Sequence, residues 1–343
     1  MTKKQWQKDE IEIVRKCPLC QSKKSSILFN SLLDMLMHND IDKWTLNICN
    51  ECTVAYLSPR PNQQSVHKAY VDYYTHGDEN STIKEGKVSV IISYLKKNIY
   101  KVKYKRESSI KDFFIYLLLL INYPIYLFLD AKIRHIGSLK GNKNRLLDLG
   151  CGNGEFLVFA KDLGWDVMGL DVDKGAVNSA LSKGVNVQLG GMESLNKEDM
   201  FDMITLNHVI EHVYNPVELI QMCYRHLNPG GKLWLETPNV NSIGLNVYKE
   251  YWRGLEPPRH LILYNARVLS ILLSDAGFLN IDQKTHGLSG IYMGLQSAKN
   301  IDKFMYDQPL YTGILKYPKI LFIEIIQLLF KSKSEFITLM AYK

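Results

Sequence analysis

The chain has 343 residues, of which 46% are apolar and 22% charged, ordinary proportions for a globular protein. This composition excludes a disordered, collagen-like or fully membrane-embedded chain, and the length allows one large domain or two smaller ones. The formal net charge is +7, but 42 basic residues stand against 35 acidic ones. The excess predicts a local basic patch and does not make nucleic acid the expected partner.

The N-terminal run MTKKQWQKDE contains no apolar stretch, so we expect no secretory signal. A chain that is not exported meets the reducing cytoplasm, where its six cysteines are expected to be thiols rather than disulfides. The sequence therefore predicts a cytoplasmic protein.

Residues 1–60 hold two C-x-x-C pairs, Cys17 with Cys20 and Cys49 with Cys52. Two such knuckles supply four thiolates for a tetrahedral zinc ion, and a site with no open position is structural. Zinc would stabilise a segment that is too small to build its own core. The alternative, a redox C-x-x-C, requires a thioredoxin-like context that this sequence does not show.

Residues 61–140 combine a basic run with an apolar one. Six basic residues fall within 96–106, and residues 113–129 carry no charge. Asn122 and Pro124 interrupt the apolar run, so we expect two short helices rather than one membrane span. These helices either cap the substrate pocket or lie in a membrane interface, where the lysines favour anionic headgroups. A second apolar stretch, 317–331, is their candidate partner.

Residues 141–343 alternate short apolar runs with helical patterns, which is typical of a doubly wound α/β fold. We expect strands near 145–150, 165–173, 185–190, 201–207, 232–239, 278–287 and 336–343. We expect helices near 155–164, 174–184, 215–231 and 266–277, the third of which begins at Asn215 and Pro216.

The first of these strands ends in a glycine loop with the pattern Asp148-x-Gly150-x-Gly152-x-Gly154. Glycines let the backbone approach a ligand closely at a helix N-terminus. A dinucleotide fingerprint would need glycine where Glu155 stands. Asp148 suits a cofactor with an ammonium group and would repel a pyrophosphate.

An acid follows at the end of the second strand. Asp171, with Asp173 as the nearby substitute, can accept hydrogen bonds from both hydroxyls of a ribose. The plainer interpretation is an ordinary tight turn followed by a helix cap. The agreement of loop, acid and strand order favours the cofactor site.

From about residue 144 to the C-terminus, these features resemble class I methyltransferases dependent on S-adenosylmethionine (SAM). The resemblance implies a seven-stranded sheet whose last strand, 336–343, is antiparallel. It implies that the glycine loop holds the methionine part of SAM, that Asp171 binds the ribose and that Met192 follows the strand beside the adenine. Asn207 would face the methionine moiety.

Three further stretches, NHVIEHVYNPVEL, LNPGGKLWLETPN and YWRGLEPPRHLILYN, resemble bacterial enzymes related to the ubiquinone-pathway O-methyltransferases, often encoded among cell-surface glycan genes. The front section resembles the zinc-knuckle heads of related methyltransferases. This likeness implies a lid in which Tyr73, Tyr74 and His76 reach over the active site; the alternative is a packed aromatic segment.

Methyl transfer to a hydroxyl requires a base, and histidine is the usual one near neutral pH. The candidates are His208, His212 and His260. The spacing His208-x-x-Glu211-His212 would put these side chains on one face of a helix, where they could bind a metal. The relatives carry E-x-x-E-H there with a divalent metal, and His208 departs from their first glutamate. The third interpretation is a structural Glu211–His212 pair.

A further segment that could contact the methyl acceptor lies around Pro257 and Pro258. The two prolines predict an extended, surface-facing loop at Arg259 and His260. Tyr251 and Trp252 could form a wall for a sugar or an aromatic ring. In the main domain, Cys151 and Cys223 are expected to be buried small hydrophobic side chains.

The sequence thus predicts a SAM-dependent methyltransferase with a structural zinc module. The best-supported reaction is O-methylation of a surface-glycan sugar or of a lipid-linked or quinone-like acceptor, at the inner face of the membrane if the apolar stretches bind lipid. The alternatives are C-methylation of a nucleotide-linked keto sugar and a catalytically silent SAM-binding scaffold. No nucleic acid is expected, because no aromatic target motif follows the fourth strand.

Overall fold

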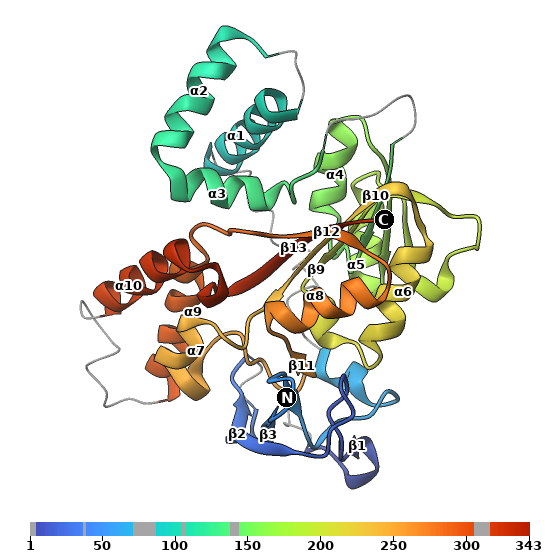
Figure 1. The fold of residues 1–343 in the computed structure, drawn as a ribbon, viewed down its shortest axis with the longest axis vertical. Coiled ribbons are helices and arrows are strands. Elements are labelled where there is room, and N and C mark those ends of the chain that lie inside the picture. Colours follow the sequence, from blue (N-terminus) through green and yellow to red (C-terminus); the bar gives the residue numbers. More distant parts are fainter. Residues whose placement is uncertain (1–4, 37–38, 71–86, 105–107, 138–143, 305–315) are drawn as a thin grey trace.

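The computed structural model describes residues 5–36, 39–70, 87–104, 108–137, 144–304 and 316–343 (Figure 1). Tyr73, Tyr74 and His76 of the expected lid lie outside these ranges.

A seven-stranded sheet forms the centre of the molecule. Its strands, in spatial order, are β12 (Leu279–Lys284), β13 (Phe336–Tyr342), β10 (Leu227–Pro238), β9 (Phe201–Asn207), β6 (Arg145–Leu149), β7 (Asp166–Asp171) and β8 (Val187–Leu189). Neighbours from β10 to β8 run parallel, whereas β13 is antiparallel to both β10 and β12. The expected doubly wound sheet with an antiparallel last strand is confirmed.

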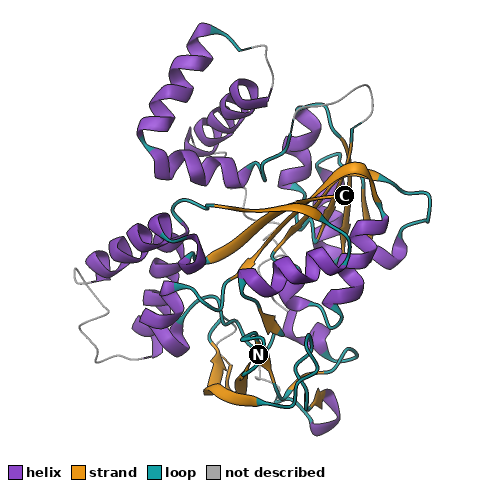
Figure 2. Ribbon diagram, in the orientation of Figure 1, coloured by secondary structure: helices purple, strands orange, loops and turns teal. Residues whose placement is uncertain are grey.

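Helices cover both faces of this sheet (Figure 2). They are α4 (Glu155–Asp162), α5 (Lys174–Ser182), α6 (Pro216–Arg225) and α8 (Ala266–Asp275). The apolar sides of α6 and α8 pack with one set of strand residues, and those of α4 and α5 pack with the other set. This alternation explains why the strands are apolar throughout, since a parallel sheet is buried on both sides. Cys151 and Cys223 are buried in these two layers, as expected.

The described residues up to 70, called here the front segment, form a small sheet completed by the main domain. Its strands are β2 (Ser25–Asp34), β3 (Asn39–Cys49), β4 (Ala55–Leu57) and, from the main domain, β11 (Ile262–Leu263). The shorter pieces are η1 (Lys8–Glu10), β1 (Ile11–Glu12), β5 (Arg60–Pro61) and η2 (Val66–Tyr70). Because β11 pairs with β4, the front segment is joined to the main domain by backbone hydrogen bonds.

Three helices, α1 (Lys87–Tyr104), α2 (Ile110–Ile121) and α3 (Tyr123–Lys132), lie beside the α4 face of the sheet (Figure 1). The apolar run is two helices, as expected, with a bend of 114° between α2 and α3. Among the described residues, no single helix is long and apolar enough to cross a bilayer; α2 and α3 meet that requirement only as a bent pair, by length and composition. Lys97 and Lys103 of the basic run pair with Asp162 and Asp130.

The C-terminal region adds a second helical group. It consists of α7 (Ile243–Tyr248), η5 (Lys249–Tyr251), α9 (Ser289–Phe304), α10 (Lys316–Leu329) and η7 (Lys331–Lys333). Two short turns, η3 (Met192–Ser194) and η4 (Ile210–His212), follow strands of the main sheet. Helix α10 packs on α9 and α7, and its buried Glu324 accepts hydrogen bonds from the backbone N–H groups of Leu288 and Ile291.

Arg259 corrects one expectation, because the loop after the two prolines is buried rather than surface-facing. The Arg259 side chain has no exposed surface. Its guanidinium pairs with both carboxylate oxygens of Asp34 on β2, donates to the Ala69 carbonyl at 3.0 Å and contacts Glu256 at 3.1 Å. One cation thus ties the front segment to the loop that precedes β11.

We expect Arg259→Ala to lower the free energy of unfolding by about 3–5 kcal/mol, because it leaves Asp34 buried and without its cation. Denaturant unfolding measures this loss. Lys24→Ala is the control, since its ion pair with Glu51 is exposed on both sides, and it should change stability by less than about 1 kcal/mol. Equal effects of the two substitutions would contradict the assigned role of Arg259.

Candidate functional site

The glycine loop after β6 is built from left-handed residues. Gly150, Gly152 and Gly154 have φ values of 66°, 54° and 76°, a region that disfavours side chains. A Cβ at Gly150 would lie 2.6 Å from Val209, and one at Gly154 would lie 2.8 Å from Ala180. A Cβ at Gly152 would meet nothing within 4 Å. The loop is therefore packed at its ends and leaves space for a ligand at its centre.

Asp171, the last residue of β7, faces this space. Its Oδ2 accepts a hydrogen bond from Gly152 N at 2.8 Å, and its Oδ1 accepts one from Asp173 N at 2.9 Å. These bonds fix the carboxylate, and each oxygen keeps a lone pair for a hydroxyl. Asp173, the substitute considered above, is engaged elsewhere, because its side chain caps α5 by accepting from Ala176 N at 2.9 Å.

Asp148 lies below the loop and is completely buried. Its Oδ1 pairs with Arg134 and accepts a hydrogen bond from Thr205 at 2.7 Å. Burial raises the pKa of Asp148, and Arg134 opposes that rise. Its Oδ2 has no hydrogen-bond partner among the described residues, so one buried acceptor remains for a cation or a donor. The sequence did not indicate Arg134, because it lies outside the glycine motif.

Met192 and Asn207 complete the set expected to hold the cofactor. Met192 opens η3 directly after β8 and is buried, whereas Asn207 ends β9 and is partly exposed. The carboxyl ends of neighbouring parallel strands meet at one edge of a sheet, and β8, β7, β6 and β9 are neighbours. The fold thus brings the predicted residues to one edge.

His208 follows β9 in a left-handed turn, with φ of 56°. Its Nδ1 lies 3.2 Å from Glu211 Oε1, and Thr237 donates to the other oxygen of Glu211 at 2.9 Å. The expectation that His208, Glu211 and His212 share one face of a helix is wrong, because only Ile210–His212 is helical and it forms one short turn. His208 precedes this short turn and does not share a helical face with Glu211 and His212, and its side chain is 34% exposed.

Glu211 is a buried carboxylate surrounded by imidazoles. Burial alone would raise its pKa, but the hydrogen bond from His208 and the nearby His212 and His260 lower that pKa to about 2. For His208, burial works toward a lower pKa, yet the hydrogen bond and the charge of Glu211 leave its pKa raised. An ionised Glu211 thus orients His208 and strengthens it as a base.

A second imidazole–carboxylate pair, not found from the sequence, faces the first. His286 Nε2 lies 3.8 Å from Glu236 Oε1, and His208 Nε2 lies 3.9 Å from the same oxygen. Thr338 donates to the other oxygen of Glu236 at 2.5 Å. The ring of Phe336 stands edge-on to both histidines, with centroid distances of 4.9 and 5.5 Å. Polar side chains and an aromatic wall thus form a candidate acceptor site.

The other two predicted bases are less accessible. His260 is buried, with Nδ1 bound to the Gly254 carbonyl at 2.8 Å, and burial lowers its pKa to about 4. His212 Nδ1 lies 3.0 Å from both the Tyr70 hydroxyl and the Arg259 carbonyl. Trp252, expected as a wall for the acceptor, is instead buried and donates to Glu335 at 2.6 Å.

Two groups of side chains have the arrangement of metal ligands. The four thiols of Cys17, Cys20, Cys49 and Cys52 lie within 4.8 Å of one another. Glu211, His212 and His260 also have ligand atoms within 4.8 Å of one another, so His260 takes the place that the sequence gave to His208.

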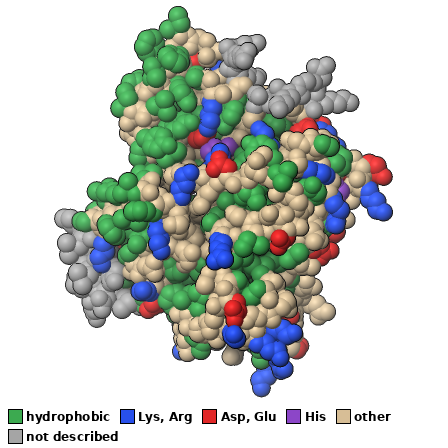
Figure 3. All heavy atoms as spheres, in the orientation of Figure 1, with side chains coloured by type: hydrophobic (Ala, Val, Ile, Leu, Met, Phe, Trp, Pro, Cys, Tyr) green, Lys and Arg blue, Asp and Glu red, His purple; other side chains and the backbone are tan. Residues whose placement is uncertain are grey.

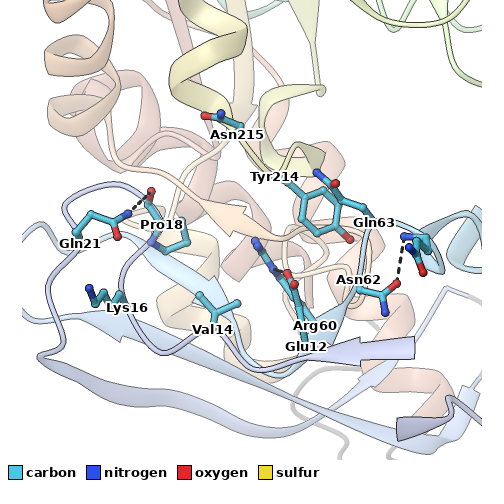
Figure 4. Close-up of a pocket in the computed structure, with 11 residues that line it drawn as sticks. Glu12, Val14, Lys16, Pro18, Gln21, Arg60, Asn62, Gln63, Tyr214 and Asn215 are labelled. Atoms are coloured by element: carbon cyan, nitrogen blue, oxygen red, sulfur yellow. Dashed lines mark hydrogen bonds and ion pairs between the residues drawn. The ribbon is translucent and has the colours of Figure 1, made fainter. Parts of the chain in front are cut away.

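A surface pocket lies where the front segment meets the residues that begin α6 (Figure 4). Its wall is fixed by the ion pair between Arg60 and Glu12 at 2.7 Å and by the hydrogen bond from Tyr214 to the Pro61 carbonyl at 2.8 Å. No residue of the glycine loop and no histidine of the acceptor site lines it. This pocket is separate from the candidate active site.

Residues 122–283 match the family model described as a methyltransferase domain. The ubiquinone biosynthesis O-methyltransferase of Coxiella burnetii (strain RSA 493 / Nine Mile phase I) is 31% identical over 128 residues, which are 34% of this chain and 54% of that protein. The enzyme of the same name from Pseudomonas entomophila (strain L48) is 35% identical over 112 residues, 30% of this chain and 47% of that protein.

The chain spans about half the length of these curated relatives. A solved structure of phosphoethanolamine N-methyltransferase 2 from Haemonchus contortus in complex with SAM aligns with a TM-score of 0.47 and 17% identity. That alignment covers 84% of this chain and 62% of the other.

The buried His260 predicts a pH dependence of stability. Its pKa is about 4 in the folded protein and 6.5 ordinarily, so the unfolded chain binds the proton more tightly. Its contribution to stability is complete above pH 6.5 and is lost as the pH falls toward 4, by about 3 kcal/mol in total. Denaturant unfolding across this range should therefore show a flatter pH dependence for His260→Asn, which keeps a donor for Gly254. His67→Asn, at an exposed histidine of η2, should keep the wild-type slope; a wild-type slope in His260→Asn would contradict the assignment.

Proposed function

We propose that the protein is a SAM-dependent methyltransferase that transfers a methyl group to a hydroxyl oxygen, with His208 as the catalytic base. The observation that carries this proposal is the position of the His208–Glu211 pair beside the open glycine loop. Val209, the residue after His208, packs against Gly150, so the base and the cofactor loop share one boundary. The methyltransferase domain at 122–283 supports the same reaction class.

The residues around the loop fit SAM. The space at Gly152 admits the methionine chain, Asp171 accepts the ribose hydroxyls, and the unpaired Oδ2 of Asp148 is available to the ammonium group. Asn207 and Met192 border the same edge of the sheet, toward the methionine and adenine ends. When bound, SAM supplies an electrophilic methyl group on a sulfonium sulfur.

The proton of the acceptor hydroxyl is the part of the reaction that this chain handles. His208 donates its Nδ1–H to Glu211, which leaves the lone pair on Nε2 to accept the hydroxyl proton. Glu211 stabilises the imidazolium that forms, and Thr237 holds Glu211 in place. Glu211 is thus a positioning residue. Glu236 and His286 provide further polar contacts for the acceptor.

The acceptor in this proposal is a sugar of a surface glycan or a lipid-linked or quinone-like molecule. We infer a ring-shaped acceptor, because the ring of Phe336 adjoins the polar pairs His208–Glu211 and His286–Glu236. The name of the two relatives, ubiquinone biosynthesis O-methyltransferase, supports transfer to oxygen. C-methylation of a keto sugar would use the same base, and the position of the methyl group in the product distinguishes the two reactions.

We further propose that the four cysteines hold a structural zinc ion. The Cys17–Cys52 and Cys20–Cys49 sulfurs lie 3.5 and 3.4 Å apart, near the roughly 3.8 Å that two thiolates at about 2.3 Å from one zinc ion require. Against the effect of burial, backbone N–H groups and the other thiols lower the pKa of Cys49 to about 7, whereas burial raises the pKa values of Cys17 and Cys52. Cysteines that are free of disulfides persist in a reducing compartment, so we propose that the protein is located in the cytoplasm.

The proposal is tested by transfer of labelled methyl from SAM into extracts of the native organism, separated into organic and aqueous phases. We expect the label in one phase with the wild-type protein. Label in the organic phase identifies a lipid-linked or quinone-like acceptor, and label in the aqueous phase identifies a glycan or nucleotide sugar. His208→Ala should lower transfer by about 10²- to 10⁴-fold without changing SAM affinity measured by calorimetry.

The controls separate binding from chemistry. Asp171→Ala should lose both SAM affinity, by at least about tenfold, and transfer, because two hydrogen bonds to the ribose disappear. Asp166→Ala, at the other end of β7, should change neither. Wild-type protein that binds SAM and transfers no label to any extract would instead be a silent scaffold, and transfer within about threefold of wild type in both His208→Ala and His260→Ala would exclude a histidine base.

Metal analysis tests the zinc proposal. We expect about one zinc ion per chain in the wild-type protein. Cys20→Ser and Cys49→Ser should each lose the zinc ion and lower the melting temperature, because the metal joins both knuckles. Cys223→Ser, at a buried cysteine of the main domain, should keep the metal. Less than about half an equivalent of zinc in the wild-type protein would contradict the site.

A further inference from the structure

Helix α2 has an apolar surface that the protein does not cover. Of its twelve residues only Leu119 is buried, and the exposed fractions of Ile110, Phe114, Leu118 and Ile121 are 79%, 61%, 66% and 82%. These positions follow a spacing of four, four and three, so they form one stripe along the helix. A stripe of this kind normally faces a core, and here it faces outward.

Helix α10 repeats the pattern. Tyr317, Leu321, Ile325 and Leu329 recur every four residues and are 57%, 57%, 47% and 68% exposed. The opposite side of α10 is buried in the protein, with Ile320 and Ile323 in contact with the core. Apolar side chains gather over α2 and over α10 on the same side of the molecule in Figure 3. Large exposed apolar surfaces of this type mark sites of interaction.

The charges beside these stripes are positive. The acidic side chains of α2, α3 and α10 have partners within the protein. The Asp112 carboxylate accepts hydrogen bonds from Ser109 and Asn98, Asp130 pairs with Lys103 and His135, and Glu324 accepts from backbone N–H groups. Lysines are exposed instead, at Lys111 on α2, Lys132 on α3, and Lys331 and Lys333 after α10. Apolar side chains edged by lysines complement the acyl and headgroup layers of an anionic membrane.

Helix α10, which carries one stripe, and α3, which directly follows α2, border the candidate acceptor site. Gly287, next to His286, lies against α3, since a Cβ there would be 2.2 Å from the Pro124 carbonyl. Phe128 of α3 stands edge-on to His286 at a centroid distance of 6.3 Å. On the other side, Glu324 of α10 binds the backbone N–H of Leu288. The loop that carries His286 is therefore held between α3 and α10.

We propose that the exposed stripes of α2 and α10 bind the surface of an anionic phospholipid bilayer, and that the acceptor reaches His208 from that bilayer. The second clause rests on the proposed function and deepens it, because it assigns the acceptor to the membrane phase. The protein lies on the surface with both stripes among the headgroups and upper acyl chains. In this arrangement the acceptor approaches His208 beside the loop that carries His286, which α3 and α10 hold.

Sedimentation of the full chain with vesicles tests the membrane contact without any methyl transfer. We expect binding to vesicles of phosphatidylcholine mixed with phosphatidylglycerol, and weaker binding to phosphatidylcholine alone. Phe114→Ser with Leu118→Ser, and separately Leu321→Ser with Ile325→Ser, should each weaken binding at least tenfold, since each removed side chain buries enough apolar surface for about a tenfold effect. All four positions are exposed, so the variants should keep the wild-type melting temperature.

The matched control is Ile271→Ser with Leu279→Ser, which are 49% and 64% exposed outside both stripes and should leave binding unchanged. Wild-type protein that ignores the anionic vesicles, or stripe variants that bind as well as wild type, would overturn the proposal. The proposal would also be overturned if the wild-type protein were a dimer in the absence of vesicles and the stripe variants were monomers. The stripes would then bind a second copy of the chain. Vesicle binding by a protein that transfers no methyl group to any extract would refute the proposed function, and with it delivery of the acceptor from the bilayer, but not the membrane contact.

Discussion

The buried guanidinium of Arg259 is the interaction on which the arrangement of the site depends. A cation without exposure is stable only if carboxylates surround it, and here one comes from the front segment and one from its own loop. The carbonyl of Arg259 itself contacts His212, and Leu261, two residues later, donates its N–H to the Glu211 carbonyl at 2.8 Å. The contacts of this loop therefore determine both where the front segment packs on the main domain and where Glu211 and His212 lie.

This link gives the four-cysteine cluster a role beyond its own segment. Asn265 donates to the Cys52 carbonyl at 3.1 Å, and β4, which follows the second knuckle, pairs with β11. A metal bound as proposed would fix the knuckles and with them β11 and, through Arg259, the loop behind the histidines. The front segment thus acts as a support for the acceptor site as well as a separate cysteine module.

The central sheet and the conformation of the glycine loop were predictable because their signals are local. Short apolar runs between helical patterns define each strand, and the positive φ values of Gly150, Gly152 and Gly154 are conformations that glycine adopts readily. The rest depends on contacts between distant residues. Arg134 with Asp148, His286 with Glu236 and Arg259 with Asp34 each join different segments, and no local pattern marks such pairs. The two prolines before Arg259 predicted an extended loop on the surface. The chain instead turns there, with the Arg259 N–H donating to the Glu256 carbonyl at 3.0 Å, and it is buried, because exposure depends on what packs over a loop.

The two histidines nearest Glu211 show why the choice of base needed the fold. Both stand close to the same buried carboxylate, yet the pKa of His208 is raised and that of His260 is lowered to about 4. His208 receives the short contact at 3.2 Å and keeps access to the acceptor space, whereas His260 Nε2 is 4.0 Å away and its ring is buried. In the proposed reaction, the charge of one glutamate therefore favours His208 over His260 as the base. From the sequence alone, His208, His212 and His260 were equally good candidates for the base. Their hydrogen bonds and burial distinguish them.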